Sequence, residues 1–324
     1  MDLRIGTRGS ALALAQTGQT AERLRATGVA AELVVIKTSG DRLSDRPLAQ
    51  VGGKGLFIKE LEEALVEGSI DLAVHSMKDL PAELAPGFAL AAVTSRADVR
   101  DVLVVRASGA PPAPIAGTAP DPEAPGLALL PALAALPRGA RVGTGSLRRR
   151  AQLAALRPDL EVVAMRGNVD TRLRKLDAGE FDAIVLAAAG LERLGVRVAA
   201  SPLDPRAFLP APGQGALALE CRAGDRRVLD ACGALDDPAT RAACAAERAF
   251  LRGLGASCQV PVAALATLGG RELALDGLVA SLDGARVLRG KTAGPTARAE
   301  AIGTRLASDL IARGADRLLA ALAQ

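Results

Sequence analysis

Polar residues that could do chemistry appear where a short apolar run ends. The run Asp71–Val74 is followed at once by the sequence HSMKD, residues 75–79. Ligands in open α/β sheets bind beyond the carboxyl ends of strands. A hydroxyl, an ammonium and a carboxylate at this point therefore favour a ligand site around Ser76, Lys78 and Asp79. The alternative is that Lys78 and Asp79 belong to a solvated turn.

Three further segments, 6–10, 142–150 and 165–172, each combine arginine, a hydroxyl and glycine where a predicted strand turns into a helix. Backbone N–H groups at a helix start attract anions, and arginine binds carboxylates in a bidentate fork. Together the three segments predict a ligand with several negatively charged groups. None of these segments has the residue spacing of a Walker phosphate-binding motif. The alternative is that the arginines of 148–150 form a solvated helix face.

A glycine loop at 52–55 carries Lys54 and precedes a predicted helix. Apolar residues, Phe57 among them, recur at helical spacing from Leu56 to Leu65, and Gly68 ends this helix. The sequence PGQG at 212–215 is either a close approach of the backbone or a turn between domains.

The elements that must position these residues alternate between strand and helix. The first part predicts a mostly parallel sheet with helices on its faces, and the pattern repeats after residue 140. The expected strands are Leu3–Thr7, Ala31–Lys37, one at Leu72, Arg141–Thr144, Glu161–Met165 and Ala183–Ala187. Helices are expected from Ser10 to about Thr27, from Leu56, and from near Ser146 and Thr171.

The C-terminal part has a different pattern. A helix at Ala242–Leu254 is followed by predicted strands Leu273–Val279 and Arg286–Lys291, which a turn at Asp283-Gly284 joins. A helix from about Thr296 to Arg313 completes a small α+β unit. Residues 107–137 are rich in Pro and Ala and predict a surface loop with one short helix near Leu127–Leu136.

Composition limits the class of protein. The 324 residues are 49% hydrophobic and 23% charged, which indicates a globular chain, and the net charge is +4. Trp and Tyr are absent and only five Phe occur, so the stacking platforms of single-strand nucleic-acid binders are missing. The net charge allows an anionic ligand and does not demand nucleic acid. Arginine, which outnumbers lysine by 34 to 6, is the residue that pairs carboxylates in a bidentate fork.

The cysteines and the single histidine favour no metal. Cys221, Cys232, Cys244 and Cys258 form no CxxC pair, and His75 is the only histidine. The first three cysteines read as core residues, whereas Cys258 lies in the loop sequence GASCQVP. No signal peptide or membrane-spanning run is evident, so a cytoplasmic protein with free thiols is expected.

Taken in order, the motifs resemble the porphobilinogen deaminase (hydroxymethylbilane synthase) family over nearly the whole chain. They are Thr7-Arg8, VGGKGLF at 51–57, HSMKDLP at 75–81, SLRRR at 146–150, RGNVDTR at 166–172, PGQGA at 212–216 and SCQVP at 257–261. Each motif is weak alone, but their joint order is specific.

The resemblance implies an α/β fold of two similar anion-binding-type domains that face each other across a cleft, with a small α+β C-terminal domain. The expected domains are 1–95 with 216–235, then 100–210, then 238–324. It implies a transferase of tetrapyrrole and heme biosynthesis that joins four porphobilinogen molecules head to tail, releases four ammonia and frees linear hydroxymethylbilane by hydrolysis. A dipyrromethane cofactor would be attached covalently to Cys258. A monomer that needs no metal, nucleic acid or membrane is expected.

The resemblance also assigns site residues. Asp79 matches the family's catalytic aspartate, whose carboxylate can stabilise the cationic centre left by departing ammonia and shuttle protons. For His75, an orienting or packing role is expected rather than a catalytic one. The expected cofactor- and substrate-binding residues are Arg8, Ser10, Lys54, Phe57, Ser76, Lys78, Thr144, Ser146, Arg148, Arg149, Arg166, Gly167, Arg172 and Gln214.

Two departures and one alternative remain. The family usually has Ser-Ser where this chain has Gly145-Ser146, and the loop before the cofactor cysteine, often glycine-rich, is Ala256-Ser257 here. Residues 107–137 are also longer than the family leads us to expect. The alternative function is a non-catalytic two-lobed protein that binds an organic anion, which would need neither Asp79 in the cleft nor a reactive Cys258.

Overall fold

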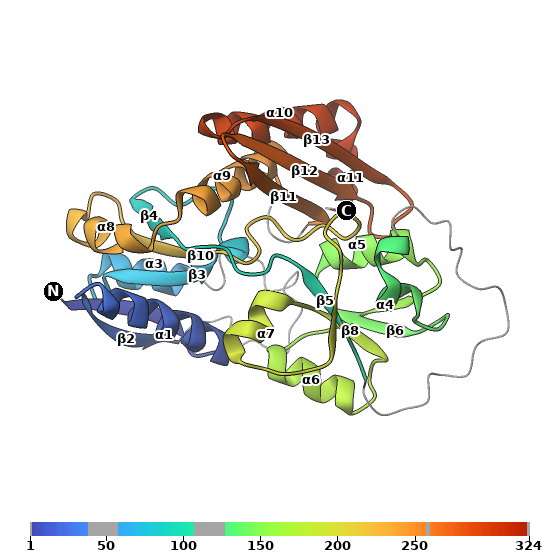
Figure 1. The fold of residues 1–324 in the computed structure, drawn as a ribbon, viewed down its shortest axis with the longest axis horizontal. Coiled ribbons are helices and arrows are strands. Elements are labelled where there is room, and N and C mark those ends of the chain that lie inside the picture. The colour runs from blue at the N-terminus through green and yellow to red at the C-terminus, as the bar shows by residue number, and fades with distance from the viewer. Residues whose placement is uncertain (1, 38–57, 107–126, 257–259, 323–324) are drawn as a thin grey trace.

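The computed structural model describes residues 2–37, 58–106, 127–256 and 260–322, which form three sheets (Figure 1). Lys54, Phe57 and Cys258 lie outside the described residues. Two five-stranded sheets belong to two lobes, and a three-stranded sheet belongs to a small C-terminal domain.

The N-terminal lobe is built on a sheet with helices on both faces. Helices α1 (Ala11–Ala26) and α8 (Arg226–Cys232) pack on one face, and α3 (Lys59–Val66) packs on the other. The strand order is β2 (Ala30–Ile36), β1 (Asp2–Arg8), β3 (Leu72–Ser76), β10 (Leu217–Arg222) and β4 (Phe88–Val93).

The middle lobe repeats this arrangement. Its helices are α4 (Pro131–Ala134), α5 (Leu147–Leu156), α6 (Val169–Asp177) and α7 (Ala188–Leu194). Its strand order is β7 (Glu161–Ala164), β6 (Arg141–Thr144), β8 (Ala183–Ala187), β5 (Asp101–Val105) and β9 (Ala200–Pro202). In each of the two lobes one strand is antiparallel to its neighbours. This strand is β10 in the N-terminal lobe and β5 in the middle lobe. The expectation of mostly parallel sheets is confirmed with this exception.

Two chain crossings connect the lobes, and each leads directly into the antiparallel strand of the lobe it enters. Residues 94–100 run from β4 to β5, and 203–216 run from β9 to β10. The crossings are hydrogen-bonded to each other: Ala97 N donates to Gly215 O at 3.1 Å and Arg96 Nε donates to Gln214 O at 2.9 Å. The lobes are therefore joined by a paired hinge that lies beside the carboxyl edges of both sheets.

The C-terminal domain is an antiparallel sheet covered by helices on one face, with an apolar core between them (Figure 1). Its elements are α9 (Pro238–Gly253), β11 (Val262–Gly269), β12 (Glu272–Ala280), β13 (Val287–Pro295), α10 (Ala299–Ala312) and α11 (Ala315–Ala320).

A buried carboxylate of α9 ties this domain to the hinge. Glu247 is fully buried, and its oxygens accept from both terminal nitrogens of Arg96 at 2.8 and 3.0 Å. They also accept from the backbone N–H groups of Gly213 at 2.6 Å and Ala266 at 2.7 Å. One side chain thus holds both crossings against the C-terminal domain.

Part of the predicted surface loop at 107–137 packs into the core, so the predicted surface position is wrong for Leu130, Leu133 and Leu136. The short helix expected there is α4, and Leu130 and Leu133 are fully buried in the middle lobe. Buried Arg157 donates to the carbonyls of Leu133 and Leu136 at 2.7 and 2.9 Å, which satisfies the end of that helix. Residues 107–126 lie outside the described part.

Candidate active site

The first polar cluster follows β3 in the N-terminal lobe. Met77–Asp79 form one turn of 3-10 helix at the strand's end. The hydroxyl of Ser76 accepts a hydrogen bond from Gln16 Nε2 of α1 at 3.0 Å. Lys78 is partly exposed and Asp79 is exposed, so the carboxylate is open to a ligand beyond the sheet edge.

Two of the predicted hydroxyl residues cap helices. Ser10 accepts from Ala13 N at 3.3 Å at the start of α1, next to Arg8 at the end of β1. Ser146 accepts from Arg149 N at 3.4 Å at the start of α5. A hydroxyl that accepts from the backbone keeps its own hydrogen, so both can still donate to an anion at the helix N-terminus.

The turn between β6 and α5 explains the glycine at 145. A Cβ there would lie 2.5 Å from the carbonyl oxygen of Met165. A serine at position 145 would therefore not fit this backbone. The N–H of Ser146 is used within the turn, where it donates to Thr144 Oγ1 at 3.2 Å.

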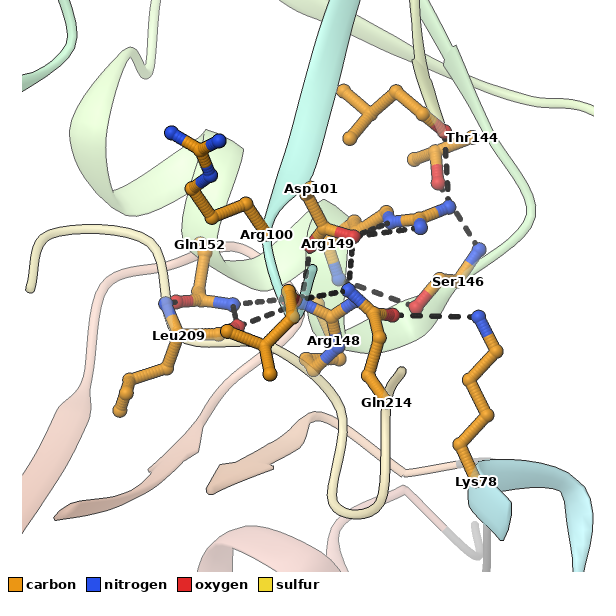
Figure 2. A network of polar contacts seen from close by, with 12 residues as sticks. Lys78, Arg100, Asp101, Thr144, Ser146, Arg148, Arg149, Gln152, Leu209 and Gln214 are labelled. Carbon is orange, nitrogen blue, oxygen red and sulfur yellow. Dashed lines mark hydrogen bonds and ion pairs between the residues drawn. The ribbon is translucent and has the colours of Figure 1, made fainter. Parts of the chain in front are cut away.

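Two arginines of α5 converge on one buried carboxylate (Figure 2). Arg148 Nη1 donates to Asp101 Oδ2 at 2.7 Å. Arg149 donates to Asp101 Oδ1 through Nη2 at 2.7 Å and Nε at 3.2 Å. Arg148 and Arg149 are 4% and 6% exposed, so the solvated-face alternative is wrong for both, and only Arg150 is exposed.

This network carries a surplus of positive charge. Burial would raise the pKa of Asp101, but Arg148 and Arg149 overcome it and hold that pKa well below its usual range. Two guanidinium groups share one carboxylate, and Arg148 Nε is buried without a hydrogen-bond acceptor among the described residues. Burial, and then the nearby Arg149, lower the pKa of Arg172 to about 10. A bound anion would relieve this crowding of like charge.

Gln214 links the two lobes across the site. Its Nε2 donates to Asp101 Oδ1 at 2.9 Å and to Val99 O at 2.8 Å, and its Oε1 accepts from Lys78 Nζ at 3.3 Å (Figure 2). Desolvation lowers the pKa of Lys78 to about 8, against the attraction of Asp79 and with further lowering by Arg149. The Lys78 ammonium therefore interacts electrostatically with charged groups of both lobes.

The structure brings one part of the predicted set together. Lys78, Gln214, Arg148, Arg149, Thr144 and Ser146 form the network of Figure 2, and Arg172 lies near enough to affect it. Arg166 and Gly167 follow β7, where Gly167 has a φ of 109° and its carbonyl accepts from Arg172 Nε at 2.8 Å. Arg8, Ser10 and Ser76 lie at the ends of β1 and β3, outside this network.

Sequence reasoning missed the residues that hold the arginines. Asp101 is the first residue of the run DVLVV, which is otherwise apolar. A single acidic residue at the start of such a run is the sequence signal that could have identified it. Gln152 Nε2 donates to Leu209 O at 3.0 Å, beside the Arg148 contact to the same carbonyl at 2.7 Å. Arg193 of α7 was also missed, and it donates to Gly215 O in the hinge at 2.6 Å.

His75 lies in the core and not in this network. It is 7% exposed, and its Nε2 lies 3.0 Å from Oε2 of Glu220, which is fully buried on β10. This position fits the packing or orienting role expected of it. The described residues contain no cluster of His, Cys, Asp and Glu suited to a metal.

The fold and site define a two-lobed α/β protein with a small third domain, in which cationic groups from both lobes meet beside the hinge. Residues 3–230 match the family model "Porphobilinogen deaminase, dipyromethane cofactor binding domain", and residues 241–312 match "Porphobilinogen deaminase, C-terminal domain". The chain belongs to the porphobilinogen deaminase family.

Curated relatives match over nearly their full length. The porphobilinogen deaminase of Syntrophotalea carbinolica is 51% identical, over 99% of this chain and 96% of that protein. That of Roseiflexus castenholzii is 50% identical, over 98% of each chain. Among solved structures, the periplasmic aliphatic sulphonate binding protein SsuA from Escherichia coli aligns with a TM-score of 0.36 at 15% identity, over 78% of this chain and 70% of that one.

Proposed function

We propose that this protein is a hydroxymethylbilane synthase, a transferase that condenses four porphobilinogen molecules head to tail, releases four ammonia and hydrolyses the product free. The observation that carries the proposal is the convergence of Lys78, Arg148 and Arg149 around Asp101 and Gln214. Each pyrrole unit bears two carboxylates, and a buried, positively charged cluster is suited to them.

The donor set fits a dipyrromethane cofactor. Arg148 has a buried Nε without an acceptor among the described residues, and the hydroxyls of Thr144 and Ser146 lie on the same turn. With Arg149 and Arg172, these residues would hold the cofactor's carboxylates. When bound through Cys258, the dipyrromethane supplies the pyrrole carbon to which the first substrate unit is joined. Arg8, Ser10, Lys54, Phe57, Ser76, Arg166 and Gly167 complete the proposed binding set.

Asp79 is the proposed catalytic residue. Its carboxylate is exposed beyond β3, and the charges of Asp79 and Lys78 interact. As ammonia leaves porphobilinogen, positive charge develops on the substrate, and a fixed carboxylate stabilises that charge. The same carboxylate can accept and return a pyrrole N–H proton. Lys78 beside it would bind a substrate carboxylate.

The finer assignments are part of the same proposal. The domains are 1–95 with 216–235, 100–210 and 238–324, and the three sheets support this division. We propose a cytoplasmic monomer whose partner is porphobilinogen, without nucleic acid or membrane. No helix in the described part of the chain is long and apolar enough to span a membrane.

The proposal is tested by the rate of hydroxymethylbilane formation in Asp79→Asn and in a control, Glu83→Gln, which removes an exposed carboxylate four residues further on. Asp79→Asn should lower turnover by about 10²–10⁴-fold with cofactor content unchanged, and the control should match the wild type. Near wild-type turnover in Asp79→Asn would refute the role of Asp79. A wild-type protein that binds porphobilinogen without releasing ammonia, and gives no colour with acidified Ehrlich's reagent, would indicate a binding protein instead.

A further inference from the structure

A buried pair of ionisable side chains joins the two central strands of the N-terminal lobe. His75 of β3 and Glu220 of β10 are both buried, and His75 Nε2 lies 3.0 Å from Glu220 Oε2. In the described part of the chain, neither that nitrogen nor the Glu220 oxygens have a further hydrogen-bond partner. The imidazole and the carboxylate therefore compensate each other.

The surroundings of the pair are apolar. Ala73 and Ala218, which lie on the same face of the sheet, belong to apolar clusters that also contain Ile58 and Leu61. Replacing a buried ion pair by apolar residues of similar volume is often neutral or stabilising. Stability alone therefore does not explain a histidine and a glutamate at these positions, whereas a buried polar pair can specify one arrangement of the strands.

The pair spans two antiparallel strands diagonally. β3 and β10 are neighbours in the sheet (Figure 1), and their register places His75 opposite Ala218 and Ala73 opposite Glu220. Diagonal neighbours on one face are within reach of long side chains. A slip of one residue would turn Glu220 to the other face of the sheet and separate it from His75. The pair is therefore compatible with the observed register and not with its neighbours.

The other side of β10 defines the register less firmly. Against β4, the register shifts between Leu219 and Glu220, and such a shift locally disrupts the ladder of hydrogen bonds. Residues 203–216 of the hinge lead directly into β10. A change in the angle between the lobes thus acts on β10 first, and the contact with β3 has to resist it.

The register of β10 also places the turn that carries Asp79. Just beyond the paired residues, Met77 N donates to Ala216 O at 3.0 Å. A Cβ on Gly213 would lie 3.2 Å from Lys78 N, so this glycine packs against the same turn. Both contacts come from the segment that leads into β10. A slip of β10 would therefore displace Asp79 relative to the hinge.

We propose that His75 and Glu220 are positioning residues, whose ion pair fixes the register of β3 against β10 and thereby holds the turn of Asp79 and Lys78 in place. The inference rests on the proposed function, in which Asp79 is the catalytic residue. Misplacement of a reacting group by about 1 Å can cost about 10²-fold in rate. The pair therefore acts on turnover more than on the stability of the fold.

The test is a double variant, His75→Leu with Glu220→Met, which replaces the pair by apolar side chains and leaves no unpaired charge. Its melting temperature should match or exceed that of the wild type. Its kcat should fall about ten- to a hundredfold, with a smaller change in KM. In hydrogen-exchange measurements the Met77 N–H should exchange faster than in the wild type, because its bond to Ala216 depends on the register. Glu220→Gln, which keeps the shape and can still hydrogen-bond the imidazole, should retain more of the kcat than the double variant.

Val74→Ala is the matched control. Val74 is buried on the opposite face of β3, in the apolar core of the lobe. Its truncation lowers stability without touching the pair, so the melting temperature should fall while kcat and the exchange of the Met77 N–H stay at their wild-type values. Equal losses of kcat in Val74→Ala and in the double variant would overturn the inference, because loss of packing would then suffice.

The double variant decides the remaining outcomes. The inference is overturned if this variant keeps the wild-type kcat, or if its kcat falls while the exchange of the Met77 N–H is unchanged. A double variant that does not fold overturns it as well, because the pair would then be required for the fold itself. If the wild type makes no hydroxymethylbilane, the proposed function fails, whereas the exchange of the Met77 N–H still shows whether the pair holds the register.

Discussion

Replacing Asp101 by Asn should destabilise the middle lobe by several kcal/mol. Oδ1 accepts three hydrogen bonds, from Arg149 Nε and Nη2 and from Gln214 Nε2, whereas Oδ2 accepts one, from Arg148 Nη1. Asn can place its oxygen at the first position and keep three of these contacts. Its NH₂ then faces Arg148, which retains Leu209 O as an acceptor.

The magnitude follows from this geometry. Removing one partner of a buried ion pair costs about 3–5 kcal/mol because an uncompensated charge remains. Asp101→Asn keeps most contacts and should cost about 3 kcal/mol, near the lower end of that range, whereas Asp101→Ala should approach the upper end. Asp204 is the control, since it binds Arg206 at 2.6 Å on the surface. Exposed pairs contribute at most about 1 kcal/mol.

Urea unfolding of the three variants and the wild type measures these differences, with the middle lobe followed separately because a multidomain chain need not unfold in one step. The pH dependence gives a second check. The pKa of Asp101 is depressed in the folded state, so its stabilisation is fully present above the unfolded pKa of about 3.9 and is lost as pH falls toward the folded value. The wild type and Asp101→Asn should differ by a constant amount from pH 8 to about pH 5 and converge in stronger acid. If the free energies of unfolding of Asp101→Asn and Asp204→Asn differ by less than about 1 kcal/mol, the buried charge network is not what stabilises the lobe.

Three further predictions concern other parts of the fold. Gly284 and Gly270 are hairpin-turn glycines with φ of 70° and 65°, but only a Cβ at 284 would meet the backbone of Ala155 in α5. Gly284→Ala should therefore lower the melting temperature more than Gly270→Ala. Equal losses would refute docking of this turn on α5. Because the pKa of Lys78 is lowered to about 8, KM for porphobilinogen should rise above that pH, and Lys78→Arg, which stays charged, should abolish the rise; a KM that is flat with pH in the wild type would contradict it. Shortening 107–126 by about half should leave turnover within a few-fold, whereas Leu133→Ala should cost about 2–5 kcal/mol of stability; a large loss of turnover in the folded short variant would make that segment part of the active site.

Local signals in the sequence identified most of the elements that carry the site. The strands Arg141–Thr144 and Ala183–Ala187 are found where they were predicted, because each is a short apolar run bounded by a turn and a helix start. Ser10 caps α1 as expected, since a cap depends only on residues within one turn.

The hinge strands could not be predicted in this way. β10 belongs to the N-terminal lobe although more than a hundred residues separate it in sequence from β3. The grouping of 216–235 with 1–95 was expected from the family resemblance alone, because no local pattern reports such a pairing. Asp101 gains its role only when β5 runs antiparallel to β8 and brings its first residue to the end where α5 begins. The sequence predicts the short helix around Leu130 and Leu133 but not its burial, because Pro and Ala dominate the sequence before it and the burial comes from packing on the middle sheet.

Intact-mass spectrometry of the isolated protein tests the central claim most directly. The account predicts that the wild type is heavier than its sequence by two porphobilinogen units less their ammonia, and that limiting porphobilinogen adds further units in a stepwise series. Cys258→Ser should show neither increment, because a hydroxyl is a far poorer nucleophile than a thiolate, whereas Cys221→Ser, at a buried position, should keep both. A wild-type mass equal to that of the bare sequence, with no covalent series on adding porphobilinogen, would contradict the account.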